Sequence, residues 1–180
     1  VQDIATKAGI AKGGMYYYFK NKEEALDALA QRQYANVIDA CNMALAESKG
    51  NALDKIKLLL FVYRSTAVDA TVDEMLHQTE NAAIHQKSIA YIHKNLAPLL
   101  AGIFVEGIEE GIFQCDWPGA LADAVLSVLV FLLDPGLFMW SGQEVLEKLK
   151  GLAGILEKSL TVSNGTFSFL YENWTNQQLV

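Results

Sequence analysis

The sequence predicts an all-α protein, with a small head of short helices at its N-terminus and a larger body of antiparallel helices. Three observations lead to this fold class. Long segments are rich in Ala, Leu, Glu, Lys and Gln, only three prolines occur, and hydrophobic residues make up 52% of the 180 residues. Strong helix formers with few breakers favour helices, and this amount of apolar material is enough for a packed core.

The head begins with two short helices. Val1, Ile4 and Ala8 recur at spacings of three and four, which places them on one face of a helix over residues 1–8. Gly9 ends this helix because glycine tolerates the left-handed conformation of a helix stop. After a link at residues 10–11, a second helix is expected over about 12–18.

A long helix follows from Asn21 to about residue 48, ending at Ser-Lys-Gly. Asn21 caps it, and Glu24 three residues later completes a variant of the capping box. The helix would be on the order of 40 Å long and would connect the head to the body. Its expected buried stripe consists of Leu26, Leu29, Val37, Ile38, Cys41 and Leu45.

The body is expected to contain helices at 52–68, 72–95 with a break, 96–113, 117–133 and 143–161. Asp116 is the expected cap of the helix that has Pro118 in its first turn. The Asp-Pro-Gly sequence at 134–136 ends that helix, and Asn-Gly at 164–165 forms a turn. The aromatic-rich segment after this turn, residues 167–174, is predicted to fold back on the body as a short helix.

Charge is distributed unevenly along the chain. The net charge is −7, but residues 1–22 carry four lysines and one aspartate, which gives +3 there and leaves −10 for residues 23–180. A basic end on an acidic body indicates that only the first segment meets a polyanion such as nucleic acid.

The stretch KGGMYYYFKNK, residues 12–22, concentrates aromatic and basic side chains. Met15 and Phe19 lie four apart and form the natural inward pair, so at least two of the three tyrosines must face outward. Tyrosine hydroxyls and lysines are phosphate donors, and the two glycines allow another backbone to approach closely. Together with the preceding helix these features predict a helix-turn-helix reading head. The alternative is a solvated basic turn.

Residues 3–26, DIATKAGIAKGGMYYYFKNKEEAL, resemble the DNA-binding signature of the tetracycline-repressor (TetR) family of bacterial transcription regulators. EGIEEGIF, residues 106–113, resembles the helix end that precedes the family's dimerisation helices. The resemblance implies an all-helical homodimer on an operator palindrome, with a DNA-binding domain at 1–30 and an effector-binding and dimerisation domain at 31–180. It also implies a further helix ahead of the motif. The printed chain starts inside the motif, so if the protein itself began there we would expect a loosened head and weak DNA binding.

Carried over by position, the resemblance assigns DNA contacts within the head. Gln2 would touch the phosphate backbone, Lys12 and Gly13 would lie at the groove, and Gly14 would lie where a base is often read. Because Gly14 has no side chain, backbone contact or indirect readout would have to substitute. The remaining candidates are phosphate contacts at Tyr16, Tyr17 and Lys22, and Tyr18, whose position varies in the family.

The resemblance further implies a small effector in the body. The candidate lining residues are Phe61, Arg64, Met75, His77, His85, Tyr91, His93 and Phe104, and ordinary core or surface roles are the alternative for each. Arg64 either meets an acidic ligand or pairs with Asp69 or Glu80. The three histidines recur every eight residues, about 80° apart on an unbroken helix, so no metal site is expected.

Helices 117–133 and 143–161 are the predicted dimer interface, with packing inside one chain as the alternative. Their apolar stripes include Leu121, Ala124, Val125, Val128 and Phe131 on one helix, and Leu149, Leu152 and Leu156 on the other.

The sequence therefore predicts a ligand-responsive DNA-binding regulator in the cytoplasm, released from its operator by an effector. Neither a catalytic constellation nor a cofactor motif is visible, and the uncharged run at 124–133 is too short to span a bilayer. The alternative functions are a helical carrier or enzyme for small molecules or lipids without DNA binding, and a protein-interaction module. The operator, the effector, the regulated genes and the sign of regulation do not follow from the sequence.

Overall fold

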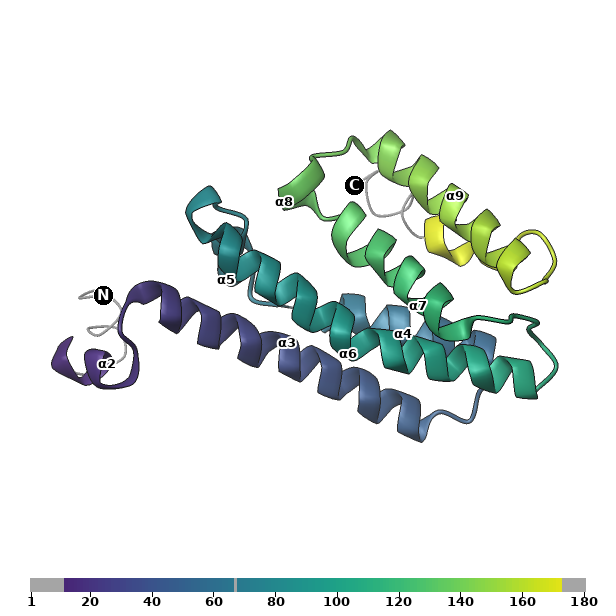
Figure 1. Ribbon diagram of the computed structural model, residues 1–180, viewed down its shortest axis with the longest axis horizontal. Coiled ribbons are helices and arrows are strands. Elements are labelled where there is room, and N and C mark those ends of the chain that lie inside the picture. Colours follow the sequence, from purple (N-terminus) through teal and green to yellow (C-terminus); the bar gives the residue numbers. More distant parts are fainter. Residues whose placement is uncertain (1–11, 67, 173–180) are drawn as a thin grey trace.

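The chain is all helical over the residues that the structure, a computed structural model, describes, which are 12–66 and 68–172. The predicted fold class is confirmed. A short helix lies at one end of a long one, and the remaining helices pack beside and above the long helix (Figure 1). In chain order the elements are α2 (Lys12–Tyr18), α3 (Lys22–Glu47), α4 (Ala52–Ser65), α5 (Ala70–Leu76), η1 (Thr79–Asn81), α6 (Ala82–Glu109), α7 (Pro118–Leu126), η2 (Ser127–Leu132), α8 (Pro135–Phe138) and α9 (Gly142–Ser159).

The long helix α3 joins the head to the body, as predicted. Its N-cap Asn21 accepts a hydrogen bond from the Glu24 backbone N–H at 2.8 Å, and the Glu24 carboxylate accepts one from the Lys20 N–H at 2.6 Å. A capping box would have the Glu24 carboxylate accept from the N–H of Asn21, but it accepts from the preceding residue, Lys20. Leu29, predicted on the buried stripe, is 44% exposed. The buried face instead continues from Leu26 through Ala30 and Tyr34, because a spacing of four stays on one side of the helix. The helix predicted over 1–8 lies outside the described residues.

Helix α6 is the centre of the body, packed against α3, α4 and α7. The predicted boundary at 95–96 is wrong, since α6 runs through Pro98 without ending. Proline removes the hydrogen bond to the Lys94 carbonyl and costs about 3 kcal/mol in a helix interior. Pro98 and Lys94 are exposed, so water can satisfy this carbonyl, while buried residues on both sides hold the helix in place. Thr79–Glu109 also has the length and apolar composition of a membrane span, but a central core helix has the same properties.

The predicted break between 72 and 95 falls at residues 77–81. Asp69 caps α5 by accepting hydrogen bonds from the Thr71 and Val72 N–H groups. The buried Asn81 side chain then donates to the Met75 carbonyl at 2.8 Å and closes the corner between α5 and α6. The chain direction therefore changes between His77 at the end of α5 and His85 in α6.

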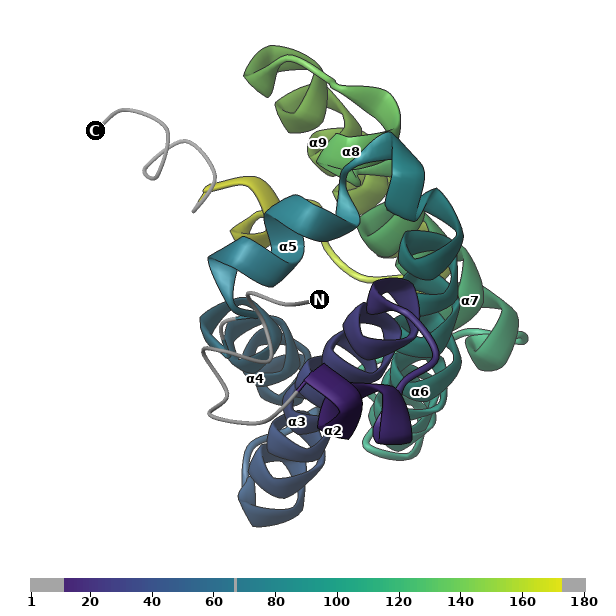
Figure 2. The ribbon, with the colours of Figure 1, turned by 90° about the vertical axis from the view of Figure 1, so that its left-hand side faces the viewer.

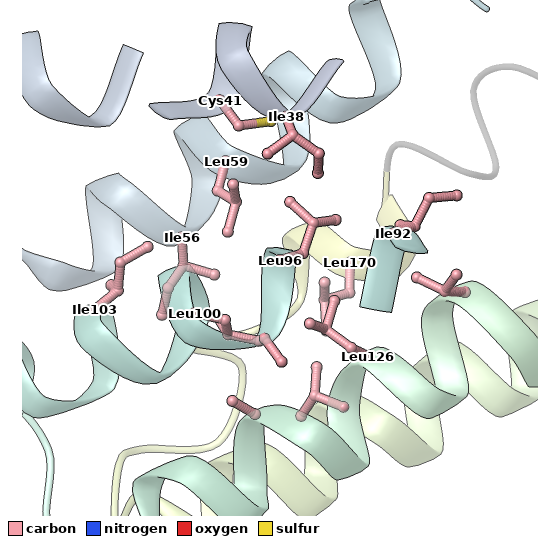
Figure 3. Packing of buried hydrophobic residues seen from close by; sticks show 14 of the residues in the cluster. Ile38, Cys41, Ile56, Leu59, Ile92, Leu96, Leu100, Ile103, Leu126 and Leu170 are labelled. Carbon is pink, nitrogen blue, oxygen red and sulfur yellow. The ribbon is translucent and has the colours of Figure 1, made fainter. Parts of the chain in front are cut away.

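One apolar core joins the helices. In Figure 3, Cys41 of α3, Leu59 of α4 and Leu96 of α6 lie around a common centre, and Leu126 and Leu170 reach it from the C-terminal half. The Cys41 thiol is fully buried and unpaired, and burial raises its pKa, whereas Cys115 is only partly buried.

The C-terminal half differs from prediction in two places. The predicted cap Asp116 is wrong, because α7 begins after Trp117, which makes no side-chain capping bond. The helix predicted over 117–133 changes at Ser127 into the π-helix η2, where the Leu133 N–H donates to Val128 rather than to a carbonyl four residues back.

The end of the described chain folds back on the body, as predicted. The helix η2 ends at Leu132, Asp134 caps α8, and a capping box between Ser141 and Glu144 starts α9. After the turn at 164–165, the Phe167 N–H donates to the buried Glu157 carboxylate at 3.0 Å, and the Phe167 ring packs near Phe113. Trp174, in the predicted aromatic segment, lies outside the described residues.

Two glycines of α6 provide a matched test of this packing. A Cβ at Gly107 would overlap the Phe113 ring and lie 2.8 Å from the Ala52 Cβ, whereas one at Gly102 would meet nothing within 4 Å. Gly107→Ala should destabilise the fold by about 1–3 kcal/mol through overpacking. Gly102→Ala should stabilise it by up to about 1 kcal/mol, because alanine is the better helix former. Urea unfolding followed by circular dichroism measures both, and equal effects would contradict the close approach at Gly107.

Candidate functional site

The head presents its tyrosines to solvent. Tyr16 is 49% exposed, Tyr17 82% and Tyr18 72%, while Phe19 is half-buried. The rings of Tyr17 and Tyr18 meet edge to face with centroids 5.0 Å apart. Lys20 and Lys22 are exposed just beyond them. Three hydroxyls and two ammonium groups on one short stretch form a surface that can donate hydrogen bonds to phosphates.

Two ion pairs connect the N-terminal turns of α3 to η1 and to the second turn of α6. Lys22 Nζ lies 3.9 Å from the Glu80 carboxylate of η1, and also 3.7 Å from Glu23. Asp27 of α3 accepts a hydrogen bond from Lys87 Nζ of α6 at 3.1 Å. Exposed pairs of this kind contribute about 0–1 kcal/mol each. They nevertheless join the head's supporting helix to the segment in which α5 turns into α6.

The body contains an apolar cavity of about 210 Å³ between α4, α6, α7 and α9. Only Tyr63 and Arg64 bring polar groups to its lining, which is otherwise made of Leu, Ile, Val and Phe side chains. Representative walls are Leu59 of α4, Leu100 of α6, Val125 of α7, Leu149 of α9 and Phe167 of the returning segment. Such a space suits an apolar group of a small molecule.

A second cavity of about 290 Å³ lies beside the first and is polar. Four residues line both cavities, so the two cavities have one wall in common: Tyr63, Leu129, Val130 and Leu133. Most of that wall comes from η2 and the residue after it, and π-helices often occur at functional sites. The polar groups of the second cavity are Tyr34, Tyr63, Asp73, His77, His85 and Asp134.

The two tyrosines of the polar cavity remain protonated phenols. Burial, with smaller contributions from Cys41, Asp134 and Asp73, raises the pKa of Tyr63 to about 12. Burial also raises the pKa of Tyr34 well above its ordinary value, with help from Tyr63, Asp73 and Asp134. Both hydroxyls can therefore donate a hydrogen bond to a ligand at neutral pH.

Four of the eight residues predicted to line an effector site lie on one of the two cavities, and four lie on neither. Arg64 and Phe104 line the apolar cavity, and His77 and His85 line the polar one. The others do not lie on these two cavities. They are Phe61, which is 68% exposed, Met75, which is 38% exposed, Tyr91, which packs on the core, and His93, which lies 3.2 Å from the Asp123 carbonyl.

Arg64 makes neither of the ion pairs considered from the sequence. No ion pair joins it to Asp69 or Glu80, and Glu80 instead faces Lys22. Among the residues described, no carboxylate lies within ion-pair distance of Arg64, which leaves its guanidinium available at the edge of the apolar cavity.

The residues of the predicted dimer stripes differ in their exposure. Val125, Leu149, Leu152 and Leu156 are buried inside the chain, and three of the four line the apolar cavity. Leu121 and Val128 are half-buried. Ala124 remains exposed, and Phe131 is 49% exposed. The chain's own helices cover these buried positions, and the dimer interface stays a prediction.

Sequence reasoning missed most of the cavity walls and the role of Asp134. Hydrophobic periodicity marks which residues are buried, but it does not show which buried neighbours leave space between them. From the sequence, Asp134 is expected only to end a helix. Its carboxylate also lies 3.0 Å from His85 Nε2, a contact between segments 49 positions apart that no local pattern predicts.

A short basic, aromatic helix at the end of a long helix, on a helical body with internal cavities, is the arrangement expected of a helix-turn-helix transcription regulator. Comparison with known families identifies the chain further. Residues 1–29 match the family described as bacterial regulatory proteins, tetR family, and residues 64–155 match the tetracyclin repressor-like C-terminal domain. The chain belongs to the tetracycline-repressor family of transcription regulators.

Curated relatives agree with this family. The chain is 33% identical over 115 residues to the fatty acid metabolism regulator protein of Bacillus subtilis, in a match covering 62% of this chain and 58% of that protein. It is 28% identical over 120 residues to the HTH-type transcriptional repressor KstR2 of Mycobacterium tuberculosis, covering 64% of this chain and 60% of that protein. The chain thus spans less than two thirds of the length of these relatives.

Filling the apolar cavity tests whether it binds ligands. Val125→Phe adds volume to a lining position, so it should lower the affinity for the fluorescent apolar probe anilinonaphthalene sulfonate by on the order of tenfold, about 1.4 kcal/mol. Val105→Phe is the control, because Val105 is 42% exposed on α6 and lies outside the lining. Fluorescence titration gives both affinities. Equal affinities in the two variants would show that the probe binds elsewhere.

Proposed function

We propose that this protein is a repressor that binds a palindromic operator as a homodimer and leaves it when a small molecule enters the body cavities. The observation that carries the proposal is the exposed row of tyrosines on α2, followed by Lys20 and Lys22. This is the basic and aromatic surface that the sequence predicts at residues 12–22. It lies at the N-terminal end of α3, which continues into the body.

On DNA, Tyr16, Tyr17 and Lys22 hold phosphates and set the orientation of the head. Lys12, Gly13 and Gly14, at the start of α2, lie at the major groove, and Gln2 contacts the backbone. Tyr18 supplies a further hydroxyl beside Tyr17. A phosphate at Lys22 competes with Glu80 for the same ammonium group, so DNA binding loosens one of the contacts between α3 and the body.

The homodimer forms through the outer faces of α7 and α9. Ala120 and Ala124 are exposed on α7, and Gly151 and the 58% exposed Ile155 are exposed on α9. A Cβ at Gly119, Gly151 or Gly154 would meet nothing within 4 Å, so these faces leave room for a partner backbone. Two symmetric heads would then read half-sites about 34–36 Å apart, in successive major grooves.

The effector has an apolar part and a polar end. The apolar cavity accepts the apolar part. The polar end meets either the hydroxyls and imidazoles of the adjoining polar cavity or Arg64, which lies at the edge of the apolar cavity. One relative is named for fatty acid metabolism, which agrees with an effector of this shape. Such a protein regulates rather than catalyses, and it acts where the operator is, in the bacterial cytoplasm.

An apolar cavity would equally serve a carrier of small molecules or lipids that never meets DNA. The two functions differ in their response to salt. Phosphate neutralisation makes DNA affinity fall steeply as salt rises, whereas carriage of an apolar ligand does not require DNA affinity at all.

Substitutions in the head test DNA binding. Lys22→Ala should weaken binding to random-sequence duplex DNA and lower the slope of log affinity against log salt by about 1, because one phosphate contact is lost. Tyr17→Phe should lower the affinity by about 1 kcal/mol without changing the slope, since it removes a neutral donor. Fluorescence anisotropy measures both. Lys49→Ala, an exposed lysine beyond the other end of α3, is the control, and head variants that bind like this control would disprove the DNA surface.

Bulky charges on the outer helices test the homodimer. Gly151→Arg and Ala124→Arg should raise the dimer dissociation constant at least about 100-fold, because the long side chains separate the partner helices and bury unpaired charge. Met43→Arg should remain dimeric, since Met43 is 65% exposed on α3, away from both helices. Sedimentation velocity at micromolar concentration gives the masses. A monomeric unmodified protein, or dissociation of the Met43 variant alone, would contradict this interface.

A further inference from the structure

Two histidines and an aspartate from three separate elements meet beside the polar cavity. His77 ends α5, His85 lies in the first turn of α6, and Asp134 caps α8. One ligand atom from each lies within 4.8 Å of the other two. The sequence argument against a metal site assumed one unbroken helix through the histidines. The break at residues 77–81 instead turns the two imidazoles toward each other, with ring centroids 4.7 Å apart.

The donor set suits a divalent first-row transition ion. His85 Nε2 lies 3.0 Å and His77 Nε2 3.9 Å from the two oxygens of Asp134. Ligand atoms bound tetrahedrally to zinc at about 2.0–2.2 Å lie roughly 3.3–3.6 Å apart, so small side-chain shifts would bring all three into range. Two imidazoles and one carboxylate match the borderline preference of zinc and its neighbours rather than that of calcium or magnesium.

Neighbouring groups hold the three ligands in position. Asp73 lies 3.7 Å from His77 Nδ1, on the opposite side of the ring from Asp134, as an outer carboxylate does in many zinc sites. Asp134 Oδ1 accepts hydrogen bonds from the Gly136 and Leu137 N–H groups at 2.9 and 3.0 Å, which fixes the carboxylate. The His77 ring lies against Gly136 so closely that a Cβ there would overlap it.

The local charge also favours a cation. Asp73 and Asp134 both face the cluster, and within the described ranges no lysine or arginine lies at ion-pair distance from either. His85 is 6% exposed. Two carboxylates beside a largely buried imidazole leave negative charge that a divalent ion would neutralise.

We propose that His77, His85 and Asp134 bind a divalent transition-metal ion such as Zn²⁺, with at least one coordination position open to the polar cavity. The cavity of about 290 Å³ that these residues line has room for a water or for a ligand oxygen at that position. Tyr34 and Tyr63 supply hydroxyls within the same cavity. The ion would fix the corner between α5 and α6 to the segment that follows η2. This proposal does not depend on DNA binding or on the identity of the effector.

Metal titration of the full chain, with any polyhistidine tag removed, tests the site. Isothermal calorimetry with Zn²⁺ should give one ion per chain with micromolar or tighter affinity, and Co²⁺ should give visible absorption bands typical of nitrogen and oxygen coordination. Absence of saturable binding would overturn the proposal.

Variants then locate the ion. His77→Gln and Asp134→Asn should each lower the Zn²⁺ affinity at least about 100-fold, and Asp73→Asn about 10-fold, as an outer partner does. Asp134→Asn keeps an oxygen that can cap α8, so the fold should survive, and circular dichroism checks this. His93→Gln is the control, because His93 contacts the Asp123 carbonyl and Ser127 instead. If His93→Gln lowered the affinity while His77→Gln and Asp134→Asn did not, the ion would lie elsewhere and the assignment would be wrong.

Discussion

The packing of α6 against α3, α4 and α7 holds the other elements in place, because this helix contacts both the helix that carries the head and the helices around the apolar cavity. Buried residues occur along α6 from Ile84 to Gly107, so the helix cannot shift in one place without disturbing its neighbours elsewhere. Its first turns carry His85 and Lys87, which face the polar cluster and α3. Its middle lines the apolar cavity through Leu96 and Leu100. A ligand that moves α6 therefore acts on the segment to which the head's supporting helix is attached.

The two adjoining cavities divide the body's chemistry. Aliphatic side chains surround one, and hydroxyl, imidazole and carboxylate groups surround the other. The π-helix η2 contributes Leu129 and Val130 to both. A π-helix is less stable than an α-helix of the same length, so it persists where tertiary contacts over-determine it. The wall formed by η2 and Leu133 is therefore in contact with both cavities.

Local sequence signals predicted the local features well. The Asn21 cap, the exposed tyrosines and the break at Asp134 each depend on a few adjacent residues, and each is present. Features that depend on distant contacts were missed or misplaced. The boundary predicted at 95–96 is absent, because buried residues on both sides of Pro98 keep α6 continuous. The histidine spacing excluded a cluster only for a straight helix, and the cavities arise from gaps between side chains that no periodicity encodes.

The buried thiol of Cys41 has a practical consequence. Its side chain has no exposure and its pKa is raised by burial, so a thiol reagent reaches it only when the contact between α3 and its neighbours opens. The rate of labelling at Cys41, relative to the more accessible Cys115, is thus a measure of the opening equilibrium of the core. The protein carries an internal reporter of how tightly α3 packs against its neighbours, and no cysteine has to be introduced to use it.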